Sequence, residues 1–451
     1  MIGQILYFRD ERYQQMQHDS VIIVGAGPTG MTLAAGLLEA GIGVVMIDAS
    51  NEGVGGGARD YIYWNKDKLK LGIMKKFTDT LANDAFKYFG NVKVGQGSDL
   101  ALNRLLDIAP VVLTCGSRGP KDMRIDGFSS TGVYDANMIV RSFNARWLHD
   151  RTSGRVTTDI ETPPIGAKVG LIGMGNVVAD IVRHISALGA IDNTQREVSI
   201  LVRRGPFANK ITTPEMKAVL PFINKEALLT EIKRILPMMI AADTAGETGL
   251  VTGDAHFEAN LDIVLKAMAI KRSSFDALKP LAVDSPAIVS FQFFSQVSRI
   301  NDINGQLHSA VVAKKASSCT RDHTQPYNTL IFSVGTAVDE TLGLLVENGG
   351  VAGDATEAYK VADKENLYFA GWVRRPSTGL AGVNIKDAKQ ALPTVIAGCQ
   401  PSTDTTAAAT QVVNQIAVMI EASGKTDYLN EKEIAARLNK EIEANQVLSF
   451  L

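Results

Sequence analysis

The amino-acid sequence predicts an α/β fold that contains two similar parallel-sheet units, and three observations support this prediction. At two places a short β-branched strand leads into a glycine-rich turn and then an apolar helix, and the first glycines of the two turns, Gly25 and Gly173, lie 148 residues apart. Each helix is followed by a second strand. The chain has 451 residues, enough for two or three domains of about 100–200 residues. This succession of elements is typical of Rossmann-like folds.

The N-terminal glycine segment begins with the strand Val21–Val24 and the turn Gly25–Gly30. A helix is expected to about Ala40, and the next strand, Val44–Ile47, is followed by Asp48. The glycines permit a tight turn and let backbone N–H groups approach a pyrophosphate at a helix N-terminus. Asp48 is placed to accept hydrogen bonds from a ribose. The segment therefore predicts dinucleotide binding.

The second glycine segment has the strand Val169–Ile172, a helix to about Leu188 and the strand Val198–Val202. This last strand ends in Arg203 and Arg204 where the first segment has an acid. Guanidinium groups bind phosphate as bidentate forks, so the pair suits a 2′-phosphate. NADP(H) is the predicted ligand, with NAD(H) as the alternative. Two such folds in one chain most often bind FAD and a nicotinamide, which assigns FAD to the acid-terminated segment.

Composition excludes several other classes of protein. The net charge of −2 gives no global electrostatic attraction to nucleic acid or an anionic membrane. The three cysteines, Cys115, Cys319 and Cys399, form no CxxC motif, and the six histidines do not cluster, so no metal site is expected. No apolar run is long enough to span a bilayer. We expect a cytoplasmic protein in a reducing compartment.

Four motifs in order resemble the adrenodoxin reductase family of ferredoxin–NADP reductases. They are AFKYFGNVKVG (Ala85–Gly95), GMGNVVAD (Gly173–Asp180), RRGPF with TTPEMK (within Arg203–Lys217) and LYFAGWVRRPSTGLAGVNIKDA (Leu367–Ala388). The similarity extends from about residue 20 to 390, with gaps around 50–65 and 225–325.

The resemblance implies two Rossmann-like dinucleotide-binding domains, with the NADP-binding domain (residues 117–335) inserted into a discontinuous FAD-binding domain (residues 18–116 and 336–451). Two strand-and-glycine segments, Val111–Gly116 and Leu330–Gly335, would be the crossings between them.

The resemblance also implies site residues. The FAD site would be formed by Gly25, Gly27, Gly30, Asp48, the backbone of Val94, Trp372, Gly379, Leu380 and Ala381. The NADP(H) site would be formed by Gly173, Met174, Gly175, Asn176, Val177, Arg203, Arg204 and Glu215. Glu215, Trp372 and Gly379 would lie at the reacting rings. From the residues alone, Trp372 is equally consistent with a core anchor, and Glu215 with a first-turn acid that favours the helix dipole.

One segment departs from the family pattern. The family has a histidine-containing segment after the first unit, but residues 54–66 contain three consecutive glycines and three aromatic side chains, and the nearest aligned position is Lys66. This departure affects the expected partner or substrate more than the cofactors.

The implied function is transfer of hydride from NADPH to FAD and of electrons to a ferredoxin-like one-electron carrier. Such carriers are acidic, and a lysine patch follows the aromatic residues, namely Lys66, Lys68, Lys70, Lys75 and Lys76. The alternative for this patch is a solvated helix face. The alternatives for the protein are a flavin-dependent oxidase or monooxygenase acting on a small molecule, and a nucleotide-binding subunit without turnover. An oligomer is possible.

Overall fold

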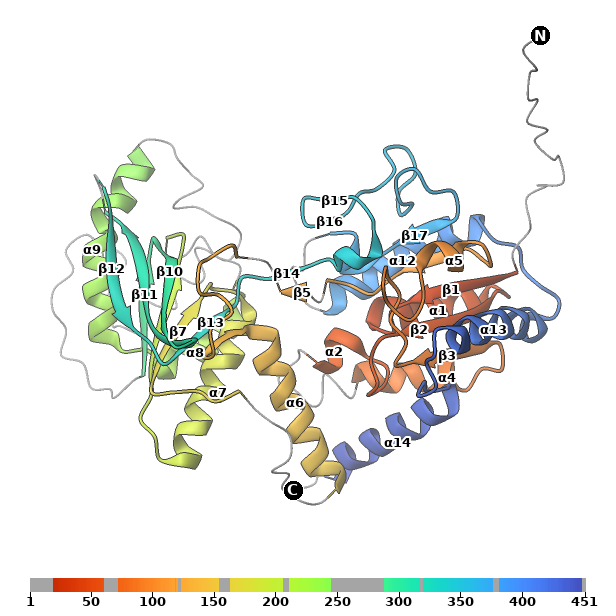
Figure 1. The fold of residues 1–451 in the computed structure, drawn as a ribbon, viewed down its shortest axis with the longest axis horizontal. Helices are drawn as coiled ribbons and strands as arrows, with labels where there is room; N and C mark the ends of the chain where they lie inside the picture. Colours follow the sequence, from red (N-terminus) through yellow and green to blue (C-terminus); the bar gives the residue numbers. More distant parts are fainter. Residues whose placement is uncertain are drawn as a thin grey trace, which may run out of the picture. The chain divides into compact units, whose positions relative to one another are not determined.

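The chain divides into two compact units in the computed structural model (Figure 1). The model describes residues 19–60, 72–117, 119–120, 123–153, 163–205, 211–244, 288–316, 319–375 and 381–447. The first unit contains the described residues in the ranges 1–59, 67–119 and 337–451. The second unit contains Asp60 and the described residues in the range 120–336.

The first unit is built on a five-stranded sheet in which every neighbouring pair is parallel. Its order is β17-β4-β1-β2-β3. The strands are β1 (Ser20–Val24), β2 (Gly43–Asp48), β3 (Phe86–Gly90), β4 (Val111–Leu113) and β17 (Leu367–Phe369). The first glycine segment supplies the two strands β1 and β2, which pair from Ser20 with Gly43 to Val24 with Ile47.

Helices cover both faces of this sheet. Helix α1 (Pro28–Glu39) contacts β1 and β2 and packs against α12 (Ala381–Ala397). On the opposite face, α13 (Thr405–Ala422) buries Ala409, Val412, Ile416 and Ile420 against alternate strand residues such as Ile22 and Val45. The period of two along each strand thus divides the apolar residues between two layers.

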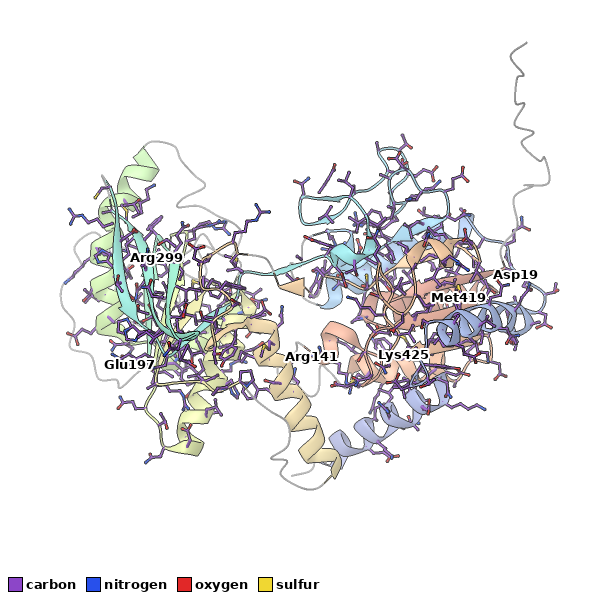
Figure 2. All side chains as sticks on the ribbon, in the orientation of Figure 1. Asp19, Arg141, Glu197, Arg299, Met419 and Lys425 are labelled. Carbon is purple, nitrogen blue, oxygen red and sulfur yellow. The ribbon has the colours of Figure 1, made fainter. Side chains whose placement is uncertain are left out.

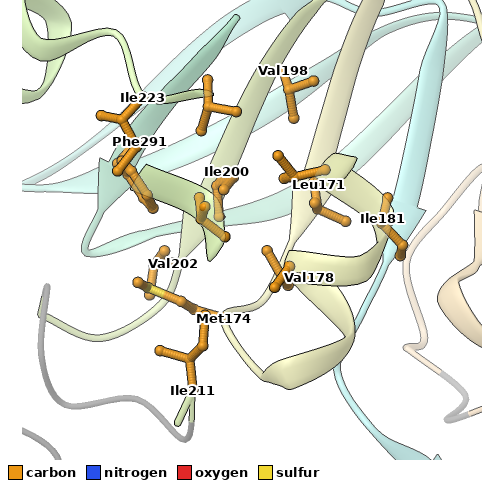
Figure 3. Close-up of a cluster of buried hydrophobic side chains, with 14 of the residues drawn as sticks. Leu171, Met174, Val178, Ile181, Val198, Ile200, Val202, Ile211, Ile223 and Phe291 are labelled. Atoms are coloured by element: carbon orange, nitrogen blue, oxygen red, sulfur yellow. The ribbon is translucent and has the colours of Figure 1, made fainter. Parts of the chain in front are cut away.

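The second unit contains another parallel five-stranded sheet, in the order β6-β13-β7-β8-β9. Its strands are β6 (Val133–Asp135), β7 (Lys168–Ile172), β8 (Glu197–Val202), β9 (Val289–Phe293) and β13 (Thr329–Phe332). Helices α6 (Ala136–Ser153), α7 (Asn176–Asp192), α8 (Thr213–Val219) and α9 (Lys225–Thr244) supply side chains to the core on one face of it. Figure 3 shows Leu171, Ile200 and Val202 from the sheet meeting Val178 and Met174 in this core.

A three-stranded antiparallel sheet covers the other face of the second unit. It consists of β10 (Ser295–Ile303), β11 (Gln306–Lys315) and β12 (Thr320–Pro326). Its buried side chains, including Val297, Leu307 and Val312, pack against Leu201 and Phe332 of the parallel sheet. Among the described residues, the helices named above pack on one face of this sheet and the antiparallel sheet on the other. The sequence analysis did not predict the antiparallel sheet.

The remaining elements lie in loops or at the C-terminal end. They are α2 (Gly56–Asp60), η2 (Lys75–Phe77), α4 (Thr78–Leu81), α5 (Leu102–Leu106), β5 (Gly119–Pro120), β14 (Thr336–Ala337), η3 (Leu220–Phe222), η5 (Glu340–Leu342), β15 (Val346–Glu347), β16 (Gly350–Val351), η6 (Gly371–Val373) and α14 (Glu431–Val447). Among the described residues, no helix is long and apolar enough to cross a membrane.

The strands expected as crossings have a different position. Both β4 and β13 are internal strands, β4 between β17 and β1 and β13 between β6 and β7. The chain passes from one unit to the other just after them, at β5 and β14, which pair with each other. The Val111–Gly116 and Leu330–Gly335 segments therefore form part of the sheets and precede the crossings.

Candidate functional sites, one in each unit

The turn after β1 can be formed only with glycine at its first position. Gly25 has a φ of +113°, and a Cβ there would lie 2.5 Å from the backbone nitrogen of Cys115, which follows β4. A Cβ on Gly30 would lie 2.1 Å from the carbonyl oxygen of Gly25 and 2.6 Å from Thr114 Oγ1. Thr114 in turn donates to the Gly25 carbonyl at 2.7 Å. The two glycines therefore let α1 and the end of β4 pack directly on the turn.

Gly27, between them, faces open space. It is the N-cap residue of α1, with φ −75° and ψ −180°, and beyond its immediate chain neighbours no atom of the described residues lies within 4 Å of the position that a Cβ would take. The first N–H groups of a helix lack intrahelical partners, and an anion is stabilised there by the dipole. The turn thus leaves a concavity at a helix N-terminus that fits the pyrophosphate of a dinucleotide.

Asp48 holds the same turn from the end of β2. Its side chain is 5% exposed. One carboxylate oxygen accepts from the backbone N–H of Ala26 at 2.5 Å, and the other accepts from that of Ser50 at 2.7 Å. A carboxylate oxygen has two lone pairs, so the group can accept a further bond. The predicted ribose acceptor is thus also a structural anchor of the glycine turn.

A second turn, η6, meets the N-terminus of α1 from the end of β17. Gly371 has a φ of +76°, and a Cβ there would lie 2.5 Å from Thr29 Oγ1 in the first turn of α1. Trp372 follows it, and the Nε1 atom of this side chain is buried without a hydrogen-bond partner in the described part of the chain. A buried N–H is normally paired. Its orphaned donor fits a site that a polar ligand such as the flavin completes.

These features gather at one edge of the first sheet. The glycine turn, Thr114 and η6 follow the adjacent strands β1, β4 and β17 at their carboxyl ends, and Asp48 ends the next strand, β2. Ligands of open parallel sheets bind at this edge. Val94, predicted to lie on the adenine side, is buried after β3 and forms a bridge with Leu100.

The second unit repeats the arrangement after β7. Gly173 has a φ of +110°, and a Cβ there would lie 2.3 Å from the carbonyl oxygen of Ser333 after β13. Gly175 is the N-cap residue of α7, and beyond its chain neighbours no atom in the described ranges lies within 4 Å of its Cβ position. Val178 occupies the position equivalent to Gly30 and is buried in the core with Met174, while Val177 packs partly against it. A second concavity that fits a pyrophosphate therefore lies at the N-terminus of α7.

Two contacts connect this turn to α8. Asn176 Oδ1 accepts from the backbone N–H of Thr212, the N-cap residue of α8, at 2.8 Å. Glu215, in the first turn of α8, is 8% exposed and pairs with Arg183 Nη2 at 3.2 Å. Arg183 also reaches Asp180 at 3.3 Å. The carboxylate of Glu215 is thus held against α7 by an ion pair.

Arg203 and Arg204 are exposed at the end of β8. Neither guanidinium takes part in an ion pair within the described ranges, and Arg204 is connected to the sheet through its carbonyl oxygen, which accepts from Phe294 N at 3.2 Å. Two exposed guanidiniums that follow β8, the strand paired with β7, would suit a phosphate.

Some predicted residues lie outside the described part of the chain. These are Gly379, Leu380, Lys68, Lys70 and residues 61–66 of the 54–66 segment, which include Lys66. Ala381 begins α12. Of the lysine patch, Lys75 and Lys76 are described, and both are exposed in η2. Within the described residues, no group of three or more His, Cys, Asp or Glu is arranged to hold a metal.

The sequence analysis missed the residues that support these turns. In the first unit these residues are Thr29, which packs against Gly371, Thr114, which donates to the Gly25 carbonyl, and Asp387, which accepts from the Gly371 N–H. Asp387 lies inside the motif Leu367–Ala388, so its position in a long sequence match was the available signal.

Comparisons with known proteins agree with this arrangement. A family model described as an FAD binding domain matches residues 18–59. The NADPH-ferredoxin reductase FprA of Mycobacterium leprae is 25% identical over 417 residues, covering 85% of each chain. The mitochondrial NADPH:adrenodoxin oxidoreductase of Arabidopsis thaliana is 25% identical over 415 residues, covering 83% of this chain and 81% of its own. The structure of FprA from Mycobacterium tuberculosis in complex with NADPH aligns with a TM-score of 0.66 at 20% identity, covering 95% of this chain and 99% of that one.

The fold and the two glycine turns define a flavoprotein with two dinucleotide-binding folds. Within that class, the chain is similar over more than four fifths of its length to NADPH-dependent reductases of the adrenodoxin reductase type.

Proposed function

We propose that this protein is an NADPH-dependent flavoprotein reductase that passes electrons from NADPH, through FAD, to a ferredoxin-like one-electron carrier. The observation that supports it most directly is the pair of open glycine turns with different strand ends. One turn is followed by the buried acid Asp48, and the other by the exposed pair Arg203 and Arg204. The relatives named as NADPH-ferredoxin and NADPH:adrenodoxin reductases match over more than four fifths of this chain.

The first unit would hold FAD. The concavity at Gly27 and the α1 N-terminus would take the pyrophosphate, and Asp48 would accept from the ribose. Trp372 would line the isoalloxazine together with the backbone of Gly379, Leu380 and Ala381. When bound, FAD supplies the ability to accept a hydride and release electrons singly.

The second unit would hold NADP(H). Gly175 and Asn176 at the start of α7 would receive the pyrophosphate, and Arg203 and Arg204 the 2′-phosphate. Glu215, held by Arg183, would orient the nicotinamide end as a hydrogen-bond acceptor. Hydride transfer depends mainly on positioning and exclusion of water, which is what these contacts would provide. In this proposal the domains are the predicted ranges 18–116 with 336–451 and 117–335.

The three cysteines are free thiols, and none lies near another in sequence. A dithiol relay is therefore not part of the proposal, and electrons would leave the flavin directly. Lys75 and Lys76 would contribute to docking of an acidic carrier, together with Lys66, Lys68 and Lys70. We place this activity in the cytoplasm.

The test is reduction of cytochrome c by NADPH and purified holoprotein, with and without an acidic [2Fe–2S] ferredoxin. The proposal expects a clear dependence on the ferredoxin. Oxygen consumption that a small organic substrate stimulates without any carrier would instead identify an oxidase or monooxygenase.

A further inference from the structure

A buried aspartate under the η6 turn links that turn to α12. Asp387 of α12 is 5% exposed. Its Oδ2 accepts from the backbone N–H of Gly371 at 2.6 Å, and its Oδ1 accepts from Arg374 Nη2 at 2.5 Å. One carboxylate thereby fixes both ends of the four-residue segment that contains Trp372.

The turn is also held from its outer side. The guanidinium of Arg374 lies over the ring of Tyr359, 4.5 Å from its centroid, and the Tyr359 hydroxyl lies 3.5 Å from Asp387 Oδ1. Burial, and secondarily the charge of Asp387, raises the pKa of Tyr359, so this hydroxyl stays protonated and can donate. Arg375 Nε lies 3.7 Å from the same carboxylate oxygen.

The charges in this group do not cancel. Arg374 and Arg375 contribute two positive charges and Asp387 one negative charge, which leaves a net charge of about +1 beside the turn. Since Gly371 packs on Thr29 in the first turn of α1, the group adjoins the concavity assigned to FAD.

We propose that Asp387 is a positioning residue of the flavin site and that it holds Trp372 in place. Its negative charge also offsets the positive charge of Arg374 and Arg375, and thereby lowers the reduction potential of the bound flavin. This inference rests on FAD binding by the first unit and on no property of NADPH or the carrier. Positive charge near a flavin favours its reduced form, so removing the carboxylate should raise the potential.

The experiment measures the potential of bound FAD by equilibration with a reference dye, in holoprotein reduced without NADPH. Asp387→Asn is expected to shift the potential to more positive values. Arg374→Gln, at a side chain 31% exposed, is expected to shift it to more negative values. The double variant should return close to the wild-type value. The affinity for FAD should fall about tenfold in Asp387→Asn, because an amide has one acceptor oxygen and cannot hold both ends of the turn that contains Trp372.

If Asp387 had only a structural role, the Asp387→Asn and Arg374→Gln variants would not shift the flavin potential in opposite directions. Asp404→Asn is the matched control, because Asp404 also accepts a backbone N–H, from Ala407 at 2.9 Å, but caps α13 on the surface. It should leave the potential unchanged. Shifts of the same sign in the two variants, or no shift in Arg374→Gln with FAD still bound, would overturn the inference. If Asp387→Asn does not fold, the sign of the Arg374→Gln shift still decides. A wild-type holoprotein that NADPH fails to reduce would refute the proposed function and leave this measurement intact.

Discussion

The carboxylate of Asp48 accepts a hydrogen bond at 2.5 Å from the backbone N–H of Ala26, across 22 residues of sequence. It connects the end of β2 to the middle of the glycine turn after β1. The shape of the turn is therefore set by the same side chain that is proposed to accept from the ribose, and the protein itself organises the concavity proposed to hold FAD.

Asp48→Asn should weaken both the first unit and its affinity for FAD. An amide keeps one acceptor oxygen, but its NH2 group would face a backbone N–H that needs an acceptor. We expect a loss of about 1–3 kcal/mol in the free energy of unfolding and at least a tenfold rise in the Kd for FAD. Urea unfolding and FAD titration measure the two. Asp354→Asn, at an exposed loop cap, is the control, and equal effects of the two substitutions would contradict the role of Asp48.

Two alanine substitutions in the turn after β1 should have different consequences, one for FAD affinity and the other for the stability of the fold. Gly27→Ala adds a methyl group to open space at an ordinary φ of −75°, so the protein should keep its unfolding midpoint while its affinity for FAD falls about tenfold or more. Gly30→Ala places a methyl group 2.1 Å from the Gly25 carbonyl oxygen, so it should destabilise the fold itself. Thermal unfolding of the apoprotein distinguishes them. A destabilised Gly27→Ala with normal FAD affinity would show that the concavity is not the binding site.

Arg203→Gln and Arg204→Gln should change nucleotide preference. Each loss of a charge-assisted contact with the 2′-phosphate should weaken NADPH binding about ten- to a hundredfold and leave NADH binding nearly unchanged. Isothermal titration with both nucleotides measures this. Arg299→Gln is the control, because Arg299 is an exposed arginine on β10 of the same unit (Figure 2). Parallel losses for NADPH and NADH would argue against a phosphate contact.

Replacing Lys75 and Lys76 with glutamate tests the carrier surface. Both side chains are exposed, so the fold should tolerate the change. Ferredoxin-dependent reduction of cytochrome c should slow by about tenfold at low salt, while reduction of a small dye by NADPH is unaffected. Lys432→Glu with Lys440→Glu, on α14, gives the same change in charge elsewhere on the first unit. Equal ferredoxin turnover in the two double variants would refute docking at this patch.

His184 should make the stability of the second unit depend on pH. Burial, with a further contribution from the charge of Arg196, lowers its pKa to about 2 from an ordinary 6.5. Below pH 6.5 the unfolded chain binds a proton that the folded chain does not, so stability is complete above that pH and falls towards pH 2. The expected loss between pH 7.5 and 5.5 is about 1.4 kcal/mol. Urea unfolding of His184→Gln should lack this component, whereas the exposed His323→Gln should retain it.

The sequence predicted the elements around the two glycine turns well, because short local signals determine them. The expected strand Val44–Ile47 extends to Gly43–Asp48, and the expected strand Val198–Val202 begins one residue earlier, at Glu197. The glycines could be recognised because strand, turn and helix are contiguous. The acid Asp48 at the end of β2 predicted FAD, and the arginines Arg203 and Arg204 after β8 predicted NADP(H).

The contacts that hold the two glycine turns and η6 in place could not be predicted in the same way, because they join residues that are distant in the sequence. The contact of Gly371 with Thr29 and the bond of Asp387 to the Gly371 N–H depend on strand order, which places β17 beside β4. The antiparallel sheet was missed because its polar strand β12 is exposed along most of its length and shows no alternation. The ion pair of Glu215 with Arg183 joins residues that lie 32 positions apart on two helices, and likewise needs tertiary packing.

The most direct test of the account is an anaerobic visible spectrum of the purified protein, titrated first with NADPH and then, in a separate sample, with NADH. The account predicts a flavin band that NADPH bleaches at much lower concentration than NADH. A colourless protein that does not take up FAD, or a flavin that stays oxidised in excess NADPH, would contradict it.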